Sequence, residues 1–173
     1  MVGKEKVRER EAETSGPTHY DESMQRQKRI IEQARRGIKV IKGKEKPFEI
    51  NRQGIIRNYA DKENSTLANN NWNIFCHEIR QHSGRHSHQG GINLFVIKGR
   101  GYTVMDGQRY DWSEGDLILL PIKKGGMEHQ HFNLDPNKSA YWMAFIYMPM
   151  QEQAGVEFVQ VEDHPDWVGP KRK

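Results

Sequence analysis

The 173-residue sequence lacks several features that secreted and membrane proteins depend on. It contains a single cysteine, Cys76, so no disulfide can form within the chain, which fits a reducing compartment. No stretch approaches the roughly 20 consecutive apolar residues of a membrane-spanning helix. The first residues, MVGKEKVREREAE, have no apolar segment of the kind found in secretory signal peptides. We therefore expect a cytoplasmic protein with no membrane partner.

Apolar residues are also scarce, at 35% of the chain, which indicates that part of its length is surface or tail. The charge is uneven: residues 1–62 hold 16 Lys and Arg against 10 Asp and Glu, whereas residues 63–173 hold 11 against 13. Nucleic-acid binding would need a basic face with base-reading or stacking residues. Here the basic positions are mixed with acids on a helix-like segment. We expect a solvated helix face and no nucleic-acid partner.

The N-terminal part divides by composition into a tail, a helix and a connector. Residues 1–19 are charged and lack apolar periodicity, so we expect them to be disordered. From Asp21 to about Ile38 apolar residues recur near helical spacing, and Asp21 or Ser23 can cap the start, which predicts one amphipathic helix. We expect residues 20–68, this helix and its connector, to pack on the domain that follows.

From residue 72 onward the pattern is typical of strands. WNIFCHEIR alternates, LILLP is short and apolar, and Asp106-Gly107 is a hairpin signal between two strand-like runs. About seven strands with no helix between them predict an all-β antiparallel sandwich or small barrel. We assign this domain to residues 69–162, with VEFVQVE as one more candidate strand, and residues 163–173 to a C-terminal tail.

Two histidine pairs are the candidate functional residues of this domain. Side chains two apart on a strand share one face, so His86 and His88 point the same way, and so do His129 and His131. A small barrel that turns both pairs inward could bring them together, and imidazoles suit Fe, Zn, Cu or Ni. Solvent-exposed histidines on surface strands are the alternative. Two such pairs favour a metal site.

The stretch from Gly84 to Asn133 resembles the two motifs of the cupin superfamily. The first motif, His-x-His and then a glycine at the end of the strand, matches three residues: His86, His88 and Gly99. The second runs from a glycine through a proline to a histidine and, four positions later, an asparagine, and it matches Gly115, Pro121, His129 and Asn133. The resemblance implies a double-stranded β-helix, a jelly-roll barrel with the metal inside, here with an N-terminal α-helical extension.

The sequence departs from these motifs in two places. The first motif usually contains a glutamate seven residues before Gly99, where this chain has Ile92. The loop between Pro121 and His129, IKKGGME, is also longer than the common motif allows. The ring-cleaving dioxygenases similar to gentisate 1,2-dioxygenase also lack the glutamate, and GDLILLP…HQHFN is similar to their second motif. Those enzymes have a basic residue soon after the missing glutamate, where Leu94 stands here.

The resemblance to ring-cleaving enzymes implies a ligand set and a substrate class. It implies that His86, His88 and His129 bind a divalent metal, Fe(II) by preference, with Zn, Ni or Mn as alternatives. Three neutral imidazoles leave the ion its full charge, whereas a glutamate would reduce it. Such a site favours a small anionic, chelating substrate, such as an ortho-hydroxy aromatic acid, together with O2.

Five further residues are candidates for catalysis or substrate binding, and each has a structural alternative. His131 is a fourth ligand, a base beside the metal, a substrate contact or a packed barrel histidine. Gln89 is a hydrogen-bond donor in the pocket or a solvated loop residue. Arg80 and Arg85 would hold a substrate carboxylate or form salt bridges at the rim. Phe95 would line an aromatic pocket or pack in the core.

The function implied by the resemblance is an oxygen-dependent dioxygenase acting on a small hydroxylated aromatic acid. A non-redox metal-dependent lyase, isomerase or decarboxylase, or a ligand-binding sensor without turnover, are the alternatives, because one fold hosts many chemistries. Many cupins pair through an outer sheet or an exchanged N-terminal segment. Since AYWMAFIYM would form an apolar, aromatic strand, we expect a homodimer.

Overall fold

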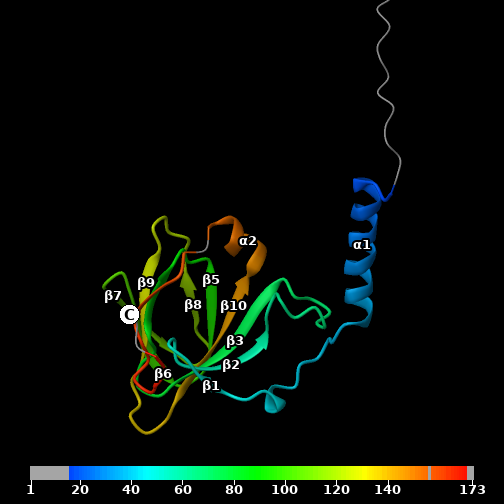
Figure 1. Ribbon diagram of the computed structural model, residues 1–173. Coiled ribbons are helices and arrows are strands. Elements are labelled where there is room, and N and C mark those ends of the chain that lie inside the picture. The colour runs from blue at the N-terminus through cyan, green and yellow to red at the C-terminus, as the bar shows by residue number, and fades with distance from the viewer. Residues whose placement is uncertain (1–15, 156, 171–173) are drawn as a thin grey trace, which may run out of the picture.

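The computed structural model describes residues 16–155 and 157–170. Most of the predicted tail over 1–19, and the end of the predicted C-terminal tail, therefore lie outside the described residues. Two antiparallel sheets face each other and form a barrel, with one long helix beside it (Figure 1). This arrangement confirms the predicted double-stranded β-helix with an N-terminal helix. No helix within the described ranges is long and apolar enough to cross a membrane.

The barrel consists of a six-stranded and a five-stranded sheet. The six-stranded sheet has the order β1-β2-β3-β10-β5-β8 and the other has the order β11-β4-β9-β6-β7. The strands are β1 Glu49–Ile50, β2 Ile55–Ala60, β3 Trp72–Ile79, β4 Arg85–His88, β5 Ile92–Lys98, β6 Arg100–Met105, β7 Gln108–Ser113, β8 Leu117–Leu120, β9 Met127–Asn133, β10 Ala140–Tyr147 and β11 Val159–Glu162. Because strands that are distant in sequence pair here, β4 and β9 become neighbours.

The hairpin between β6 and β7 follows the predicted turn signal. Asp106 and Gly107 both have positive φ, 47° and 80°, which matches the two-residue turn whose twist suits a right-handed hairpin. The hairpin holds β6 against β9, where Thr103 lies opposite His131. This local turn therefore decides what the second histidine pair contacts.

The core lies between the two sheets and supports the base of the histidine pocket. Alternation along β5 turns Ile92, Leu94 and Val96 inward, and each is almost fully buried. They pack in one cluster with Trp112 and Trp142. Burial of each large apolar side chain contributes roughly 1.5–3 kcal/mol. The pocket thus rests on the well-packed interior of the barrel.

The N-terminal helix forms where the sequence predicts it but does not pack on the barrel. α1 spans His19–Arg36 and starts with a capping box, in which Thr18 and Asp21 satisfy each other's backbone N–H groups. None of its residues is buried, and Figure 1 shows it apart from the barrel. Its hydrogen bonds to the rest of the chain include those from Gln33 Nε2 to the Leu67 carbonyl and to Asn70.

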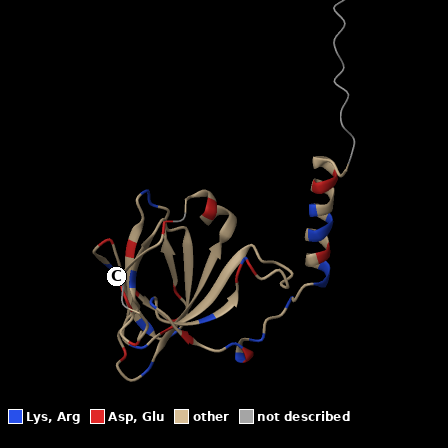
Figure 2. Ribbon diagram, viewed as in Figure 1, with Lys and Arg blue, Asp and Glu red and all other residues tan. Residues whose placement is uncertain are grey.

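The apolar side chains of α1 have no partner surface within the described residues. The apolar side chains that define its stripe, Tyr20, Met24, Ile30 and Ile31, remain exposed. Figure 2 shows basic and acidic residues mixed along the same helix, as the sequence indicated.

The strand predicted over AYWMAFIYM is followed directly by a short helix. β10 stops at Tyr147, and a short helix, α2, follows over Met148–Gln153 with Pro149 in its first turn. Proline lacks an N–H and has a fixed φ, so it suits the first turn of a helix and cannot extend a strand ladder. The consequence is functional, because α2 places Gln151 beside the histidine pocket. A single turn of 3₁₀-helix, η1 over Gly43–Glu45, lies in the basic connector.

Candidate metal centre

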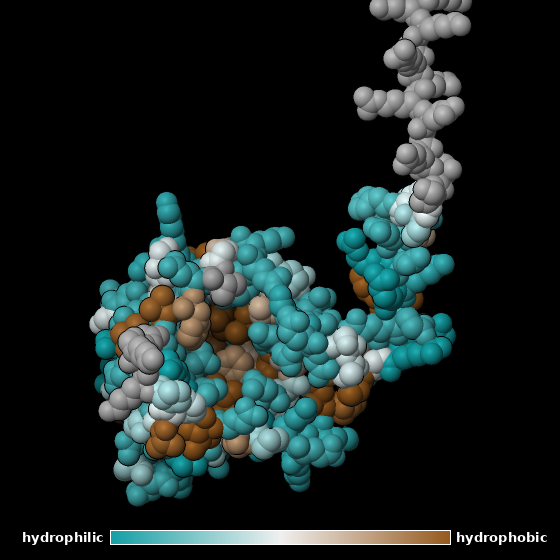
Figure 3. Space-filling view, in the orientation of Figure 1, coloured by the Kyte–Doolittle hydropathy of each residue, from teal (hydrophilic) through white to brown (hydrophobic). Residues whose placement is uncertain are grey.

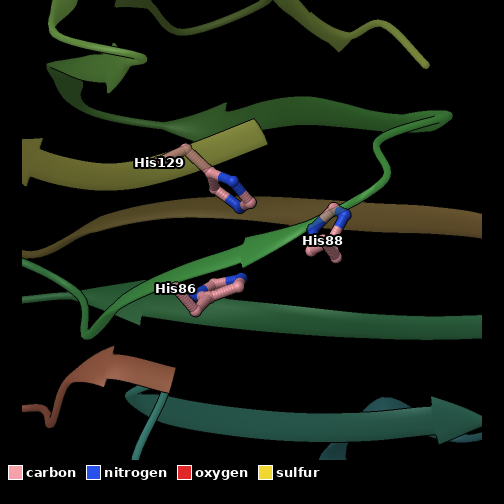
Figure 4. A group of neighbouring side chains, drawn as sticks. All are labelled: His86, His88 and His129. Carbon is pink, nitrogen blue, oxygen red and sulfur yellow. The ribbon is translucent and has the colours of Figure 1, made fainter. Parts of the chain in front are cut away.

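Three of the four paired histidines meet inside the barrel. β4 alternates, so His86 and His88 are buried while Ser87 between them is only partly so. β9 pairs with β4 so that His129 lies directly opposite His86. Each ring offers a nitrogen, and the three nitrogens lie within 4.8 Å of one another. Figure 4 shows the three rings converging from β4 and β9. This histidine group could bind a metal ion.

The three imidazoles are neutral at physiological pH, which is the form that binds metals. Burial lowers the pKa of His86 to about 2, and the neighbouring His129 and His88 contribute to that decrease. Burial also lowers the pKa of His88 to about 3 and that of His129 to about 4. Protons therefore compete weakly with a cation for these rings at pH 7.

Hydrogen bonds fix the protons of two of the rings. The Nδ1–H of His129 donates to the Met127 carbonyl at 3.1 Å, which leaves the lone pair of Nε2 free for a metal. The Nδ1 of His88 instead accepts the Gly90 N–H at 3.0 Å, so the neutral ring carries its proton on Nε2. A metal at that nitrogen requires the proton to leave or the ring to turn.

The third ring provides the test of whether a cation fits. His86 Nδ1 is buried and has no hydrogen-bond partner within the described part of the chain. Buried polar atoms without partners are rare in native proteins, and a bound ion commonly satisfies those that occur. Three buried imidazoles with nitrogens within 4.8 Å of one another form a donor set of the kind that divalent metals bind, once the proton on His88 Nε2 moves.

His131 lies beside this group but is not part of it. It is fully buried, which lowers its pKa well below the usual range. Its Nδ1 lies 2.8 Å from Thr103 Oγ1, and that hydroxyl already accepts the indole N–H of Trp112 at 3.0 Å. When the hydroxyl donates its hydrogen to Nδ1, the proton of the neutral ring sits on Nε2. This arrangement favours a hydrogen-bond donor over a fourth ligand.

The histidines line a pocket of about 380 Å³ in the barrel. Figure 3 shows a hollow in the barrel with hydrophobic side chains around it. Its apolar lining includes Phe75, Trp142 and Ile92, the last at the position of the missing glutamate, and Asp61 lines it as well. Its amide-bearing lining residues are Asn51, Gln53, Asn58, Asn73 and Gln151. A larger cavity of about 840 Å³ along β7 and β8 is lined by no histidine, so the chemistry points to the smaller pocket.

Comparison with known proteins identifies the barrel. Residues 74–146 match the family model of the cupin domain. This segment is a cupin domain. Among curated proteins, a gentisate 1,2-dioxygenase from Ralstonia sp is 33% identical over 66 residues, which are 38% of this chain and 18% of that enzyme. The chain thus spans less than a fifth of that enzyme's length.

Solved structures support the same fold. The polyketide cyclase RemF from Streptomyces resistomycificus has a TM-score of 0.53 and 15% identity, over 75% of this chain and 89% of its own. An uncharacterised double-stranded β-helix protein from Klebsiella pneumoniae has a TM-score of 0.51 and 15% identity, over 73% and 99% of the two chains. At these identities the likeness shows the fold alone.

The three residues predicted to bind substrate do not line the histidine pocket. Arg85 alternates with His86 and therefore faces away, where it pairs with Glu128 at 3.3 Å and Glu162 at 3.5 Å. Arg80 lies beyond β3 and pairs with Glu78 at 3.1 Å. Phe95 faces outward from β5 and is 43% exposed. The structure thus has the arginines in rim salt bridges, and strand alternation explains why Arg85 and Phe95 point away from the histidines.

Gln89, predicted as a catalytic residue, has a structural position instead. Its side chain is 6% exposed, and its Nε2 donates to the Gln151 carbonyl at 2.9 Å. It does not line the histidine pocket. Its observed role is to tie α2 to the end of β4, and through α2 it holds Gln151 in place.

Sequence analysis missed two pocket residues from the C-terminal segment. Gln151 of α2 lines the pocket, and Phe158 stacks on His86 with ring centroids 5.0 Å apart. Phe158 precedes β11, which pairs with β4 so that Gln160 lies opposite His86. The strand-like pattern of VEFVQVE is visible in the sequence, but only its pairing with β4 brings this phenylalanine to the histidines.

Proposed function

We propose that this cupin is a mononuclear non-haem Fe(II) dioxygenase that acts on a small hydroxylated aromatic acid with O2. The observation that carries the proposal is a group of three histidines, with no carboxylate among them, that lines a pocket with apolar and aromatic walls on one part and amides on another. His86, His88 and His129 would hold the ion. When bound, the metal supplies a Lewis acid and a redox-active centre that orients substrate and O2.

The protein's own residues would bind and orient the substrate. Neutral ligands leave the ion's charge uncompensated, which favours an anionic chelating group such as a carboxylate with an adjacent hydroxyl. Phe75 and Trp142 lie 5.9 Å apart, centroid to centroid, and provide apolar walls for an aromatic ring. His131 would donate a hydrogen bond from Nε2 to a substrate oxygen.

A non-redox metal-dependent lyase, isomerase or decarboxylase is the second candidate. The observation that favours it is His131, a buried neutral imidazole that can donate a hydrogen bond to a negative charge developing on a substrate, a role that needs no oxygen. Oxygen consumption separates the two candidates, because only the dioxygenase takes up O2 as it turns over.

The test is oxygen uptake by protein loaded with Fe(II) under anaerobic conditions. Gentisate and salicylate are the first substrates, and we expect one O2 consumed per molecule of acid and loss of the aromatic absorbance. Zinc-loaded protein is the control and should consume none. Iron-loaded protein that binds these acids but takes up no oxygen would contradict the dioxygenase and favour the non-redox candidate.

We also propose a cytoplasmic homodimer that pairs through the outer face of the six-stranded sheet. Phe95, Ile97, Leu117 and Leu119 are exposed there on β5 and β8, at 41–57% of their surface. Tyr141 and Met143 of β10 continue the same face. Contiguous apolar patches on soluble proteins commonly mark interfaces. A monomer by light scattering at micromolar concentration would contradict the pairing.

A further inference from the structure

Gln151 holds a buried hydrogen-bond acceptor that nothing in the described residues satisfies. The side chain lines the histidine pocket and is 6% exposed. Its Oε1 is buried and has no partner within residues 16–155 and 157–170. Leaving a buried acceptor unpaired costs free energy, which a donor on a bound ligand would recover.

The position of Gln151 is fixed independently of any ligand. Gln89 Nε2 donates to its backbone carbonyl at 2.9 Å, and Gln89 follows His88 directly in sequence. The backbone of Gln151 is therefore anchored to the residue that directly follows β4, the strand that carries two of the three histidines. A ligand that chelates at the histidines would have Gln151 within the same pocket.

The pocket has no cationic side chain among the described residues that could pair with a second negative charge on a ligand. No lysine or arginine is among the described residues that line it, and its one carboxylate is Asp61. Arg80 and Arg85, which could have served, pair with acidic residues elsewhere. A carboxylate buried away from the histidines would lose its water without gaining a counter-ion, and Asp61 would repel it.

We propose that Gln151 contacts the substrate, accepting a hydrogen bond from a neutral donor such as a ring hydroxyl, and that the pocket admits substrates with one negative charge only. The inference rests on the proposed function, because the single negative charge is the substrate carboxylate that would bind the metal. It narrows the substrate class to hydroxybenzoates that carry an additional donor and no additional acid.

The test is a series of binding measurements on protein loaded with Co(II). Calorimetry and the visible spectrum of the metal measure the binding of each compound. Salicylate provides the chelating pair alone. The 2,3-, 2,4-, 2,5- and 2,6-dihydroxybenzoates add one hydroxyl at each remaining position that the chelating pair leaves free. For each dihydroxybenzoate, the matching hydroxybenzene dicarboxylate carries a carboxylate at the ring carbon where the dihydroxybenzoate has its additional hydroxyl.

At least one dihydroxybenzoate should bind about tenfold more tightly than salicylate. The affinity of the matching dicarboxylate should be lower than that of this dihydroxybenzoate by about tenfold or more. Gln151→Leu should reduce the affinity of the preferred dihydroxybenzoate to that of salicylate, and it should leave salicylate within about twofold of wild type. Gln151→Lys should reverse the preference toward the dicarboxylate.

Gln153→Leu is the matched control, because Gln153 lies exposed on the same helix. It should change none of these affinities. Equal binding of hydroxyl and carboxylate compounds, or a Gln151→Leu variant that keeps the full preference for a hydroxyl, would overturn the inference while the metal site stands. A protein that binds no cobalt would overturn both the inference and the proposed function.

Discussion

At the scale of single residues, the proton on His131 is determined by a chain of two hydrogen bonds. Trp112 donates to Thr103, and Thr103 then has its hydroxyl hydrogen left for His131 Nδ1. All three side chains are buried, so water does not compete for these bonds. A hydroxyl that donates to Nδ1 leaves the proton of His131 on Nε2, the nitrogen that we propose donates to the substrate.

Thr103→Val should lower turnover with little effect on metal content. Valine keeps the shape of threonine but removes the hydroxyl, so His131 can take the other tautomer. Removing a hydrogen-bond partner that orients a histidine at a metal site typically lowers activity or metal affinity by about 10–100-fold. We expect kcat to decrease by about tenfold or more. Steady-state oxygen uptake and metal analysis measure the two effects. Thr66→Val, on an exposed loop, is the control. An unchanged kcat would show that the proton of His131 plays no part in turnover.

Strand alternation makes part of the site predictable from residues alone. The inward direction of His86, His88 and His129 follows from their spacing of two and from the pairing of β4 with β9. The same rule, applied to Arg85 and Phe95, places both outside the pocket. Gln151 was not predictable, because its position depends on a helix that starts at a proline and on a hydrogen bond from Gln89.

At the scale of elements, the strands and turns were predictable and the packing of the helices was not. Alternation and the Asp106-Gly107 turn are local signals, and the structure follows them. Whether α1 packs depends on a complementary surface elsewhere, which no local pattern encodes. In the structure α1 buries none of its residues.

Ile31→Ala in α1 should leave the stability of the barrel unchanged, whereas Ile79→Ala in β3 should lower it. Ile31 is 60% exposed and Ile79 is fully buried in the core cluster. Exposed substitutions usually change the free energy of unfolding by less than about 0.5 kcal/mol, and buried Ile→Ala costs roughly 2–5 kcal/mol. Urea unfolding measures both. If Ile31→Ala lowers the free energy of unfolding as much as Ile79→Ala does, α1 packs against a surface in solution.

At the scale of the whole molecule, the barrel encloses an unusual number of neutral histidines. His77 shares the interior with the site histidines, with its ring 4.7 Å from Trp142 and its Nε2 without a partner in the described residues. Burial lowers the pKa of His77 to about 3, and His164 contributes to that decrease. Each such ring is charged in the unfolded chain at mildly acidic pH but neutral in the folded one.

The metal-free protein should therefore lose stability on acidification from about pH 6.5 toward pH 3. In that window the unfolded chain binds more protons than the folded chain, so the free energy of unfolding falls as pH falls. The contribution of the buried neutral histidines to that free energy is complete above about pH 6.5. One unit of pKa difference corresponds to about 1.4 kcal/mol. Urea midpoints at pH 7, 6, 5 and 4 in the presence of a chelator measure the slope, and His77→Leu should reduce it. A midpoint that does not change over this range would contradict the buried neutral histidines.

The central claim, that three histidines hold one divalent metal, is tested most directly by metal content after dialysis. Wild-type protein loaded with Fe(II) under anaerobic conditions should retain one ion per chain. His88→Ala should lose most of it, because two imidazoles bind far more weakly than three, and a variant in which His86, His88 and His129 are all alanine should retain none. His19→Ala, whose histidine is exposed on α1, should keep the full amount. Full retention of metal by His88→Ala or by the triple variant would contradict the account.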